Sequence, residues 1–347
     1  MEGDLHIRQD GRAGRITLQR PDALNALTYD MVRTIEAALD AWRAAQIDLV
    51  ILEAQGPRAF CAGGDIADLY ESGVAGDFAY SQQFWRDEYR MNAKIFEYPK
   101  PVVSFLQGFT MGGGVGLGCH GSHRIVDESS KIALPECGIG LVPDVGGSFI
   151  LAHAPGHVGE YLSLTSTRIG PADAIYAGFA DHFVPADMWE DLKDQLCKTG
   201  DVAQIAAATC PPPDGVLEAA RAEIDRLFGG QTVVDILANT GGSDSGLAQK
   251  AQKAMARNAP LAMAFSMEII RRLRTATSLR AALDLEYRYT FRAMEQGDFI
   301  EGIRAAIIDK DRTPRWKHDS PQAVTELDLS TMLAPLGPNA LNWENML

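Results

Sequence analysis

The sequence predicts an α/β fold of repeated strand–loop–helix units, followed by a mainly helical region. Short apolar runs alternate with segments of helical periodicity, which indicates an α/β fold rather than a β-sandwich. The order of apolar strand, glycine-rich loop and helix recurs near residues 49, 102 and 124, so we expect a repeated supersecondary unit. At 347 residues, with 46% hydrophobic and 22% charged residues, the chain can bury a full core.

The expected elements of the first half follow from local patterns. Residues 14–21 (GRITLQRP) predict a short strand, and an amphipathic helix is expected over about residues 29–45. Residues 47–56 (IDLVILEAQG) predict a buried strand that ends in the loop GPRAFCAGGD. After a helical segment rich in aromatic and charged residues, another apolar strand is expected at 101–108. The segment RIVDESSKIALP at 124–135 predicts two short strands around a turn.

The character of the chain changes beyond residue 200. Apolar residues recur at helical spacing between proline and glycine breaks, which predicts a mainly helical region at about 201–320. The tail at 334–347 is expected to be irregular. We therefore divide the sequence into a core at 1–200 and a mainly helical C-terminal region at 201–347.

Charge and cysteine content argue against several classes of protein. The formal net charge of -14 argues against nucleic-acid binding, which needs Lys and Arg to neutralise phosphates. The uncharged stretch at 101–123 contains seven glycines and several polar residues, which argues against a membrane span. Five scattered cysteines without a CxxC pair indicate reduced thiols, and the N-terminus shows no signal peptide. We therefore expect a protein of the cytoplasm or of an organellar matrix.

Two glycine-rich loops each follow an expected strand. FCAGGDI at 60–66 leads into an expected helix, and TMGGGVGLGCHG at 110–121 repeats the arrangement. Ordinary tight turns and close helix packing would explain both loops, because glycine lets the backbone approach its neighbours closely. The alternative is that one backbone N–H from each loop converges on a developing oxyanion, as acyl chemistry requires.

Other motifs in the sequence are weaker signals. GLGCHG fits the pattern GxGxxG, but a strand rather than a helix is expected after it, so a dinucleotide site is not favoured. There is no GxxxxGK[ST] loop and no GxSxG elbow. His120 and His123 lack a complete set of metal ligands, and Cys119 and Cys137 are interpreted as small core residues.

Acidic residues occur in two apolar settings. The stretch ALPECGIGLVPDVGG at 133–147 places Glu136 and Asp144 among glycines, prolines and aliphatic residues. A carboxylate there loses hydration unless it is paired, hydrogen-bonded or protonated, so the stretch is either structurally unusual or catalytic. Asp87 and Glu88 lie between aromatic residues of a helical segment, and composition alone favours a solvated helical face for them.

Four segments, in this order and spacing, resemble the crotonase (enoyl-CoA hydratase/isomerase) superfamily: LQRPDALNALT, FCAGGDI, GFTMGGGVGLG and LPECGIGLVPDVGG. The match is closest to its 3-hydroxyisobutyryl-CoA hydrolase branch, which WRDEYRMN, TSTRIGPADAIYAGFADHFV and LEYRYTFRAMEQGDFIEGIRAAIIDKDRTPRW also resemble. The resemblance covers nearly the entire chain. It implies a crotonase-like spiral of ββα units with C-terminal helices, an acyl-CoA substrate, no separate cofactor, and a homo-oligomer of three or more copies.

The resemblance also implies roles for individual residues. The oxyanion hole would come from the backbone N–H groups of Gly64 and Gly113. Contacts with adenosine and pantetheine would lie near six residues: Leu24, Asn25, Ala26, Ala62, Asp65 and Ile66. Asp22 stands where many relatives have a lysine, so one phosphate contact differs here.

The resemblance distinguishes hydrolysis from hydration at Gly116. Hydratases of the superfamily hold a water between two glutamates, and the matching positions here are Gly116 and Glu136. The hydrolase branch has the same gap and an acidic residue at the position of Asp144. This implies hydrolysis of 3-hydroxyisobutyryl-CoA or a close 3-hydroxyacyl-CoA. Glu136 would be nucleophile or general base, Asp144 would bind the substrate hydroxyl, and Glu88 would be a substrate-side acidic residue.

Two other functions stay open at this point. An enoyl-CoA hydratase or isomerase would use Asp144 as its second acid/base group. A non-catalytic CoA-binding or RNA-binding relative is the other, although the acidic balance argues against RNA. The presence of both glycine loops together with Glu136 argues against loss of catalysis.

Overall fold

The computed structural model describes residues 3–344, which separate into two compact units. The first, here called the sheet unit, consists of the described residues up to 64, 87–133 and 168–218. The second, the helical unit, consists of residues 65–86, 134–167 and those from 219 onward. The units alternate along the chain, so each is assembled from segments that are far apart in the sequence.

The sheet unit contains two sheets. The six-stranded sheet has the order β1-β2-β3-β5-β7-β9, in which only β1 and β2 pair antiparallel. Its strands are Leu5–Asp10, Ala13–Leu18, Leu49–Ala54, Val102–Phe105, His123–Val126 and His182–Phe183. The smaller sheet is parallel, with the order β4-β6-β8. Its strands are Ala59–Cys61, Phe109–Met111 and Lys131–Ala133.

The chain alternates between the two sheets. β3, β5 and β7 lie in the large sheet, and each is followed by a short strand of the small sheet. The unit predicted to recur near residues 49, 102 and 124 therefore corresponds to three strand pairs, each followed by helical structure. As a result, a turn follows the carboxyl end of each short strand, β4, β6 and β8.

Local sequence patterns did not predict β1, β4 and β6. The predicted loop GPRAFCAGGD contains β4, so that part of the loop prediction is wrong. β4 and β6 have three residues each, which is too short for a recognisable alternation of apolar and polar residues. β1 is an edge strand with charged residues, a composition that protects sheet edges from further pairing. The other predicted strands, and the helix expected at 29–45, agree with the structure.

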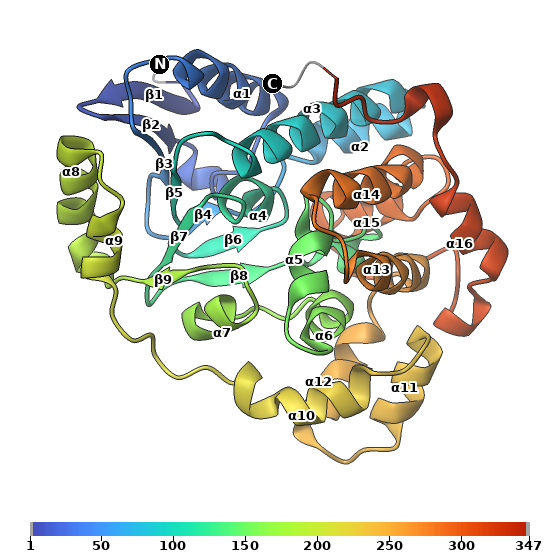
Figure 1. The fold of residues 1–347 in the computed structure, drawn as a ribbon. Coiled ribbons are helices and arrows are strands. Elements are labelled where there is room, and N and C mark those ends of the chain that lie inside the picture. The colour runs from blue at the N-terminus through green and yellow to red at the C-terminus, as the bar shows by residue number, and fades with distance from the viewer. Residues whose placement is uncertain (1–2, 345–347) are drawn as a thin grey trace. The chain divides into compact units, whose positions relative to one another are not determined.

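Helices α8 and α9 lie against one face of the large sheet (Figure 1). Phe105 of β5 contacts the ring of Trp189 on α8 edge-on, with 5.1 Å between centroids. Trp189 Nε1 also donates to the Val184 carbonyl at 2.8 Å, which satisfies its buried polar atom. The helices of the sheet unit are α1 (Tyr29–Arg43), α3 (Phe78–Phe96) from residue 87, α4 (Gly113–Gly118), α7 (Pro171–Tyr176), α8 (Trp189–Thr199) and α9 (Ala203–Ala208).

The helical unit is organised around α13 (Pro260–Leu273), as Figure 1 shows. Ten of its fourteen residues are buried, as expected for a helix that is covered on most sides. α13 contacts α5, α6 and α14. The remaining helices are α2 (Ala67–Val74), α5 (Gly147–His153), α6 (Val158–Thr165), most of α10 (Leu217–Phe228), α11 (Val233–Gly241), α12 (Gly246–Met255), α14 (Leu279–Ala293), α15 (Phe299–Ile303) and α16 (Glu326–Leu333).

The described chain beyond residue 200 contains helices and no strand, so the predicted change of secondary structure is confirmed. Division of the chain into domains at residue 200 stays a prediction. None of the helices within residues 3–344 is long and apolar enough to cross a membrane.

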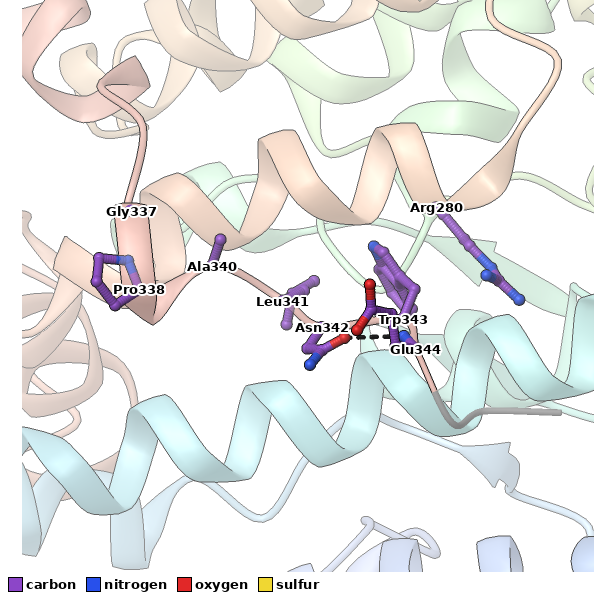
Figure 2. Close-up of a pocket in the computed structure, with 8 residues that line it drawn as sticks. All are labelled: Arg280, Gly337, Pro338, Ala340, Leu341, Asn342, Trp343 and Glu344. Atoms are coloured by element: carbon purple, nitrogen blue, oxygen red, sulfur yellow. Dashed lines mark hydrogen bonds between the residues drawn. The ribbon is translucent and has the colours of Figure 1, made fainter.

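The tail from residue 334 is irregular up to residue 344, apart from a short turn η6 (Gly337–Asn339), as predicted. Residues 345–347 of the predicted irregular tail lie outside the described residues. Trp343 Nε1 donates to Asp284 Oδ1 at 3.0 Å. The tail forms a pocket of about 560 Å³ with Arg280, and its lining residues, drawn in Figure 2, include none of the predicted site residues.

A buried network of charged and polar side chains lies between the large sheet and α8. Glu53 of β3 accepts hydrogen bonds from Arg15 Nε at 3.0 Å and from Thr17 Oγ1 at 2.8 Å. Lys193 Nζ of α8 lies 3.2 Å from its carboxylate. Burial alone would raise the pKa of Glu53. The Arg15 hydrogen bonds and the charges of Lys193 and Arg15 outweigh it and lower the pKa to about 2.

Glu53→Gln should destabilise the protein by about 3–5 kcal/mol at pH 7, because it leaves Arg15 and Lys193 buried beside a neutral group. The folded pKa of Glu53 lies below its ordinary value of 4.5, so its contribution is present above pH 4.5 and is lost as pH falls towards 2. In denaturant unfolding, the difference in the free energy of unfolding between the wild-type protein and Glu53→Gln should therefore become smaller from pH 7 to pH 3. Glu190→Gln is the control, since exposed Glu190 also pairs with Lys193 and should cost less than about 1 kcal/mol. Equal losses for both variants would contradict the prediction.

Candidate active site

Two glycine turns of the sheet unit follow neighbouring strands. β4 and β6 are parallel neighbours, so their carboxyl ends lie at the same edge of the small sheet. β4 leads to Gly64, and β6 leads through Gly112 into α4. Gly63 has a φ of +124° and Gly112 a φ of +49°, values that strain any residue with a side chain. Both turns therefore require glycine for their backbone geometry.

The backbones of Gly64 and Gly113 lie next to one another. A Cβ added to Gly113 would lie 3.2 Å from the Gly64 nitrogen and 2.9 Å from Oε1 of Glu88. Gly113 opens α4, so its N–H has no acceptor within the helix. Within residues 3–344, neither this N–H nor that of Gly64 donates to a protein acceptor. Two close backbone donors of this kind are what an oxyanion hole requires.

Gly114 has a different task. A Cβ there would lie 2.1 Å from the Cys61 carbonyl oxygen, so α4 packs directly on the end of β4. The two explanations of the glycine run, helix packing and a donor facing a ligand, therefore apply to different residues. Gly114 allows the packing, and Gly113 faces Gly64 and Glu88.

Glu88 and Asp87 are buried, with exposed fractions of 2% and 5%, so the solvated-face expectation from composition is wrong. The middle of α3 is covered by the fold, which composition does not reveal. Asp87 pairs with Arg90 at 2.9 Å and accepts from the Tyr29 hydroxyl at 2.5 Å. Glu88 instead lies beside Gly113, so α3 brings a carboxylate to the two glycine turns.

The predicted CoA-contacting residues at 24–26 lie against the turn after β4. The Ala62 N–H donates to the Leu24 carbonyl at 3.0 Å, which joins two of the predicted positions. The Asn25 side chain is buried and donates to the carbonyls of Gln55 and Ala59, both at 2.9 Å. It therefore holds the fold, and a ligand at this edge would meet backbone atoms or neighbouring side chains.

The other predicted CoA-contacting residues, Asp65 and Ile66, belong to the helical unit. Ile66 is the N-cap residue of α2, and both residues are partly exposed. Asp22 is exposed within a short turn, η1 (Pro21–Ala23), of the sheet unit. The predicted CoA-contacting positions are therefore distributed over both units.

The helical unit carries both predicted carboxylates on residues 136–148, here called the acidic loop. Glu136 begins a short turn, η2 (Glu136–Ile139), and each carboxylate-bearing residue is only 4% exposed. After Asp144 the chain turns through Val145 with a φ of +52° and Gly146 with a φ of +80°. A β-branched residue in this region costs about 1–3 kcal/mol, so the surrounding structure must hold the turn.

C-terminal helices hold the backbone of the acidic loop. A Cβ on Gly302 of α15 would lie 2.0 Å from the Ile139 carbonyl oxygen, so α15 packs directly against η2. The Tyr289 hydroxyl of α14 donates to the Gly140 carbonyl at 3.2 Å. The helical region predicted at 201–320 is therefore part of the scaffold of the candidate site.

Glu286 of α14 is a buried acidic residue that the sequence analysis missed. Its carboxylate accepts hydrogen bonds from the Gly146 N–H at 2.8 Å and the Ser148 N–H at 3.0 Å, and also from the Ser148 hydroxyl. Burial, together with the negative charge of Asp144, raises the pKa of Glu286 to about 8. A signal was present, because Glu286 interrupts the apolar stripe of α14 between Leu283 and Thr290.

The histidines and cysteines considered above lie in ordinary structural settings. His120 is buried, and His123 stacks on His182 with ring centroids 6.2 Å apart. Cys119 and Cys137 are core residues, as predicted, and burial raises the pKa of each thiol to about 12. Among the described residues, no group of His, Cys, Asp and Glu could hold a metal ion.

Comparison with known proteins agrees with this geometry. The family model described as enoyl-CoA hydratase/isomerase matches residues 13–333. A curated relative from Danio rerio, named "3-hydroxyisobutyryl-CoA hydrolase, mitochondrial", is 39% identical over 91% of this chain and 85% of its own length. The protein of the same name from Homo sapiens is 34% identical over 98% of this chain and 91% of its own length.

Two solved structures are also similar. One, described as an enoyl-CoA hydratase from Rhodobacter sphaeroides 2.4.1, has a TM-score of 0.94 and 56% identity, and the match covers 98% of this chain and 100% of that chain. The other, described as a carnitinyl-CoA dehydratase from Mycobacterium thermoresistibile, has a TM-score of 0.94 and 40% identity over 99% and 100% of the two chains.

A largely parallel six-stranded sheet, a small parallel sheet with glycine turns after β4 and β6, and buried carboxylates on a loop held by helices are the features of an acyl-CoA enzyme of the crotonase fold. The chain belongs to the enoyl-CoA hydratase/isomerase family, and the predicted fold class is confirmed. Its α4 reads GGVGLG over residues 113–118 and carries no ionisable side chain.

The two adjacent glycines of α4 should respond differently to alanine. Gly114→Ala should lower the free energy of unfolding by about 1–3 kcal/mol or more, because its Cβ meets backbone at 2.1 Å. Gly113→Ala should be more stable than Gly114→Ala, since its nearest neighbour is the end of the Glu88 side chain. It should still lose turnover of an acyl-CoA, because the new methyl group stands beside the Gly64 N–H. Urea unfolding and activity of both variants test this, and an active Gly113→Ala would contradict it.

Proposed function

We propose that the protein hydrolyses the thioester of 3-hydroxyisobutyryl-CoA, or of a close 3-hydroxyacyl-CoA, to the free acid and CoA, as in valine breakdown. The observation that carries this proposal is the composition of α4. Gly116 leaves that helix without a carboxylate, while Glu136 and Asp144 are two buried acids of the acidic loop in the helical unit. The names of the curated relatives support the same reaction.

In this proposal, the N–H groups of Gly64 and Gly113 donate hydrogen bonds to the oxygen of the thioester carbonyl. Each donor would stabilise the developing oxyanion by roughly 2.7–4 kcal/mol, because backbone donors need no reorganisation as the charge forms. Glu88 lies beside these donors and would act on the substrate side of the site. CoA would contact the segments around residues 24–26, 62 and 65–66.

Glu136 is the proposed catalytic carboxylate. By one route it attacks the carbonyl carbon, the C–S bond breaks with its electron pair leaving on the CoA thiolate, and water then hydrolyses the mixed anhydride. By the other route Glu136 takes a proton from a water that attacks the same carbon, and the C–S bond then breaks with its electron pair leaving on the CoA thiolate. Asp144 would accept a hydrogen bond from the substrate 3-hydroxyl and so position the acyl chain.

The remaining parts of the proposal concern partners and location. The reaction needs no cofactor beyond the CoA of the substrate, and the proposal includes neither a nucleic-acid nor a membrane partner. A homo-oligomer of three or more copies, in the cytoplasm or an organellar matrix, completes it. The formal net charge of -14 supports the absence of a nucleic-acid partner.

A thiol-release assay over a panel of acyl-CoAs tests the reaction. 3-Hydroxyisobutyryl-CoA should release CoA faster than acyl-CoAs that lack the 3-hydroxyl. Glu136→Gln should lower kcat by about 10²–10⁴-fold, since the catalytic carboxylate is lost. Asp144→Asn should reduce the preference for the hydroxylated substrate. The exposed residues Glu218 and Asp214 provide matched controls, because Glu218→Gln and Asp214→Asn should leave activity unchanged.

The second candidate function is hydration of an enoyl-CoA. The solved structure described as an enoyl-CoA hydratase, at 56% identity, favours this alternative. Hydration removes the absorbance of the unsaturated thioester without releasing a thiol. Fast loss of that absorbance together with no thiol release from any 3-hydroxyacyl-CoA would overturn the hydrolase proposal.

A further inference from the structure

We propose that Glu286 is a positioning residue, which holds the turn after Asp144 and keeps Asp144 in the orientation that binds the substrate 3-hydroxyl. The inference deepens the proposed function and rests on it. Glu286 itself is not assigned any contact with substrate. It lies on α14, 142 positions away from Asp144 in the sequence, yet it hydrogen-bonds the residues that directly follow Asp144.

Three donors from one short segment converge on the Glu286 carboxylate. The Gly146 N–H donates to Oε2 at 2.8 Å, and the Ser148 N–H donates to Oε1 at 3.0 Å. The Ser148 hydroxyl donates to Oε1 as well. Glu286 and Ser148 are fully buried, so water cannot replace these bonds. The carboxylate therefore defines the path of the backbone from Asp144 into α5.

The turn needs this support because of its own conformation. Val145, directly after Asp144, has a φ of +52°, a region that β-branched residues avoid. Such a conformation persists only where surrounding contacts determine it. Inside the turn, the Gly147 N–H donates to the Asp144 carbonyl at 2.6 Å. Glu286 supplies a fixed partner from α14, which packs against α5 and α13.

The charge of Glu286 is also coupled to Asp144. Burial and the Asp144 charge raise the pKa of Glu286 to about 8, although the Ser148 and Gly146 donors oppose the shift. Asp144 of the acidic loop and Ser148 at the start of α5 are the groups that face Glu286. α13 and α16 also pack against α14, but they provide no hydrogen-bond or ion-pair partner to Glu286 within residues 3–344. The raised pKa means that Glu286 gains its charge beside Asp144 as the pH rises through about 8.

The sign of the pH dependence follows from this shift. The folded pKa of Glu286 lies above its ordinary value of 4.5, so its contribution to stability is present below pH 4.5 and is lost as pH rises through about 8. Above pH 8 the second negative charge should disturb the turn and with it the orientation of Asp144. We therefore expect activity to fall at alkaline pH because Glu286 becomes charged.

The experiment compares Glu286→Gln and Glu286→Leu with the wild-type protein. Glu286→Gln keeps the shape without the ionisation, so kcat at pH 7 should stay within 5-fold while the alkaline fall with a midpoint near pH 8 disappears. Glu286→Leu removes every acceptor, so kcat should fall at least 10-fold with a KM change below 3-fold. Tyr289→Phe is the matched control on α14, because it removes a bond to Gly140 only and should keep the alkaline fall.

Two results would overturn the positioning role. One is an alkaline fall that is unchanged in Glu286→Gln. The other is a Glu286→Leu protein whose kcat loss matches its unfolded fraction. If Glu286→Leu does not fold, Ser148→Ala removes one donor and should lower kcat with little change in KM.

A readout without activity separates this inference from the proposed function. The free energy of unfolding of the wild-type protein, relative to that of Glu286→Gln, should decrease between pH 5 and pH 9. The difference between the wild-type protein and Tyr289→Phe should not change over the same range. If that trend appears but no acyl-CoA releases thiol, the proposed function fails while the coupling of Glu286 to the turn stands. If thiol is released but the trend is absent, the inference about Glu286 fails alone.

Discussion

The helical unit depends on one constraint, which is the burial of carboxylates on a loop that could not hold its conformation alone. Glu136 and Asp144 are each 4% exposed, and the turn after Asp144 contains a β-branched residue in the left-handed region. Donors from that turn converge on Glu286, and α15 packs on the backbone beside Ile139. α14 and α15 therefore hold the backbone of the loop that carries these buried acidic groups.

In the sheet unit, the polar groups of the candidate site are backbone N–H groups at the end of the small sheet. Parallel pairing of β4 and β6 places two glycine turns at one edge, where N–H groups of Gly64 and Gly113 keep no protein acceptor among the described residues. Glycine is needed twice over, for the left-handed turn at Gly112 and for the direct packing of Gly114 on Cys61. The buried Glu88 adds a carboxylate beside Gly113.

The chemistry available to a crotonase-type site depends on where its acids are placed. Hydration needs an acid and a base around a water, whereas thioester hydrolysis needs an oxyanion hole and one nucleophile or base. An α4 made of glycine, valine and leucine removes one carboxylate from the first arrangement and leaves the second intact. This composition favours hydrolysis, even though similar solved structures are described as a hydratase and a dehydratase.

The sequence by itself was enough for the family, through the order and spacing of its motifs, and for the α/β class and the change to helices after residue 200, which depend on local patterns. Its motifs also made Glu136, Asp144 and the two glycine loops the candidate site. It did not predict β4 and β6, which are defined by pairing between strands of three residues. Composition alone placed Asp87 and Glu88 on a solvated face, although the family resemblance implied that Glu88 is a substrate-side residue. Only the tertiary structure decided their burial and the role of Glu286, since both arise from contacts between segments far apart in the chain.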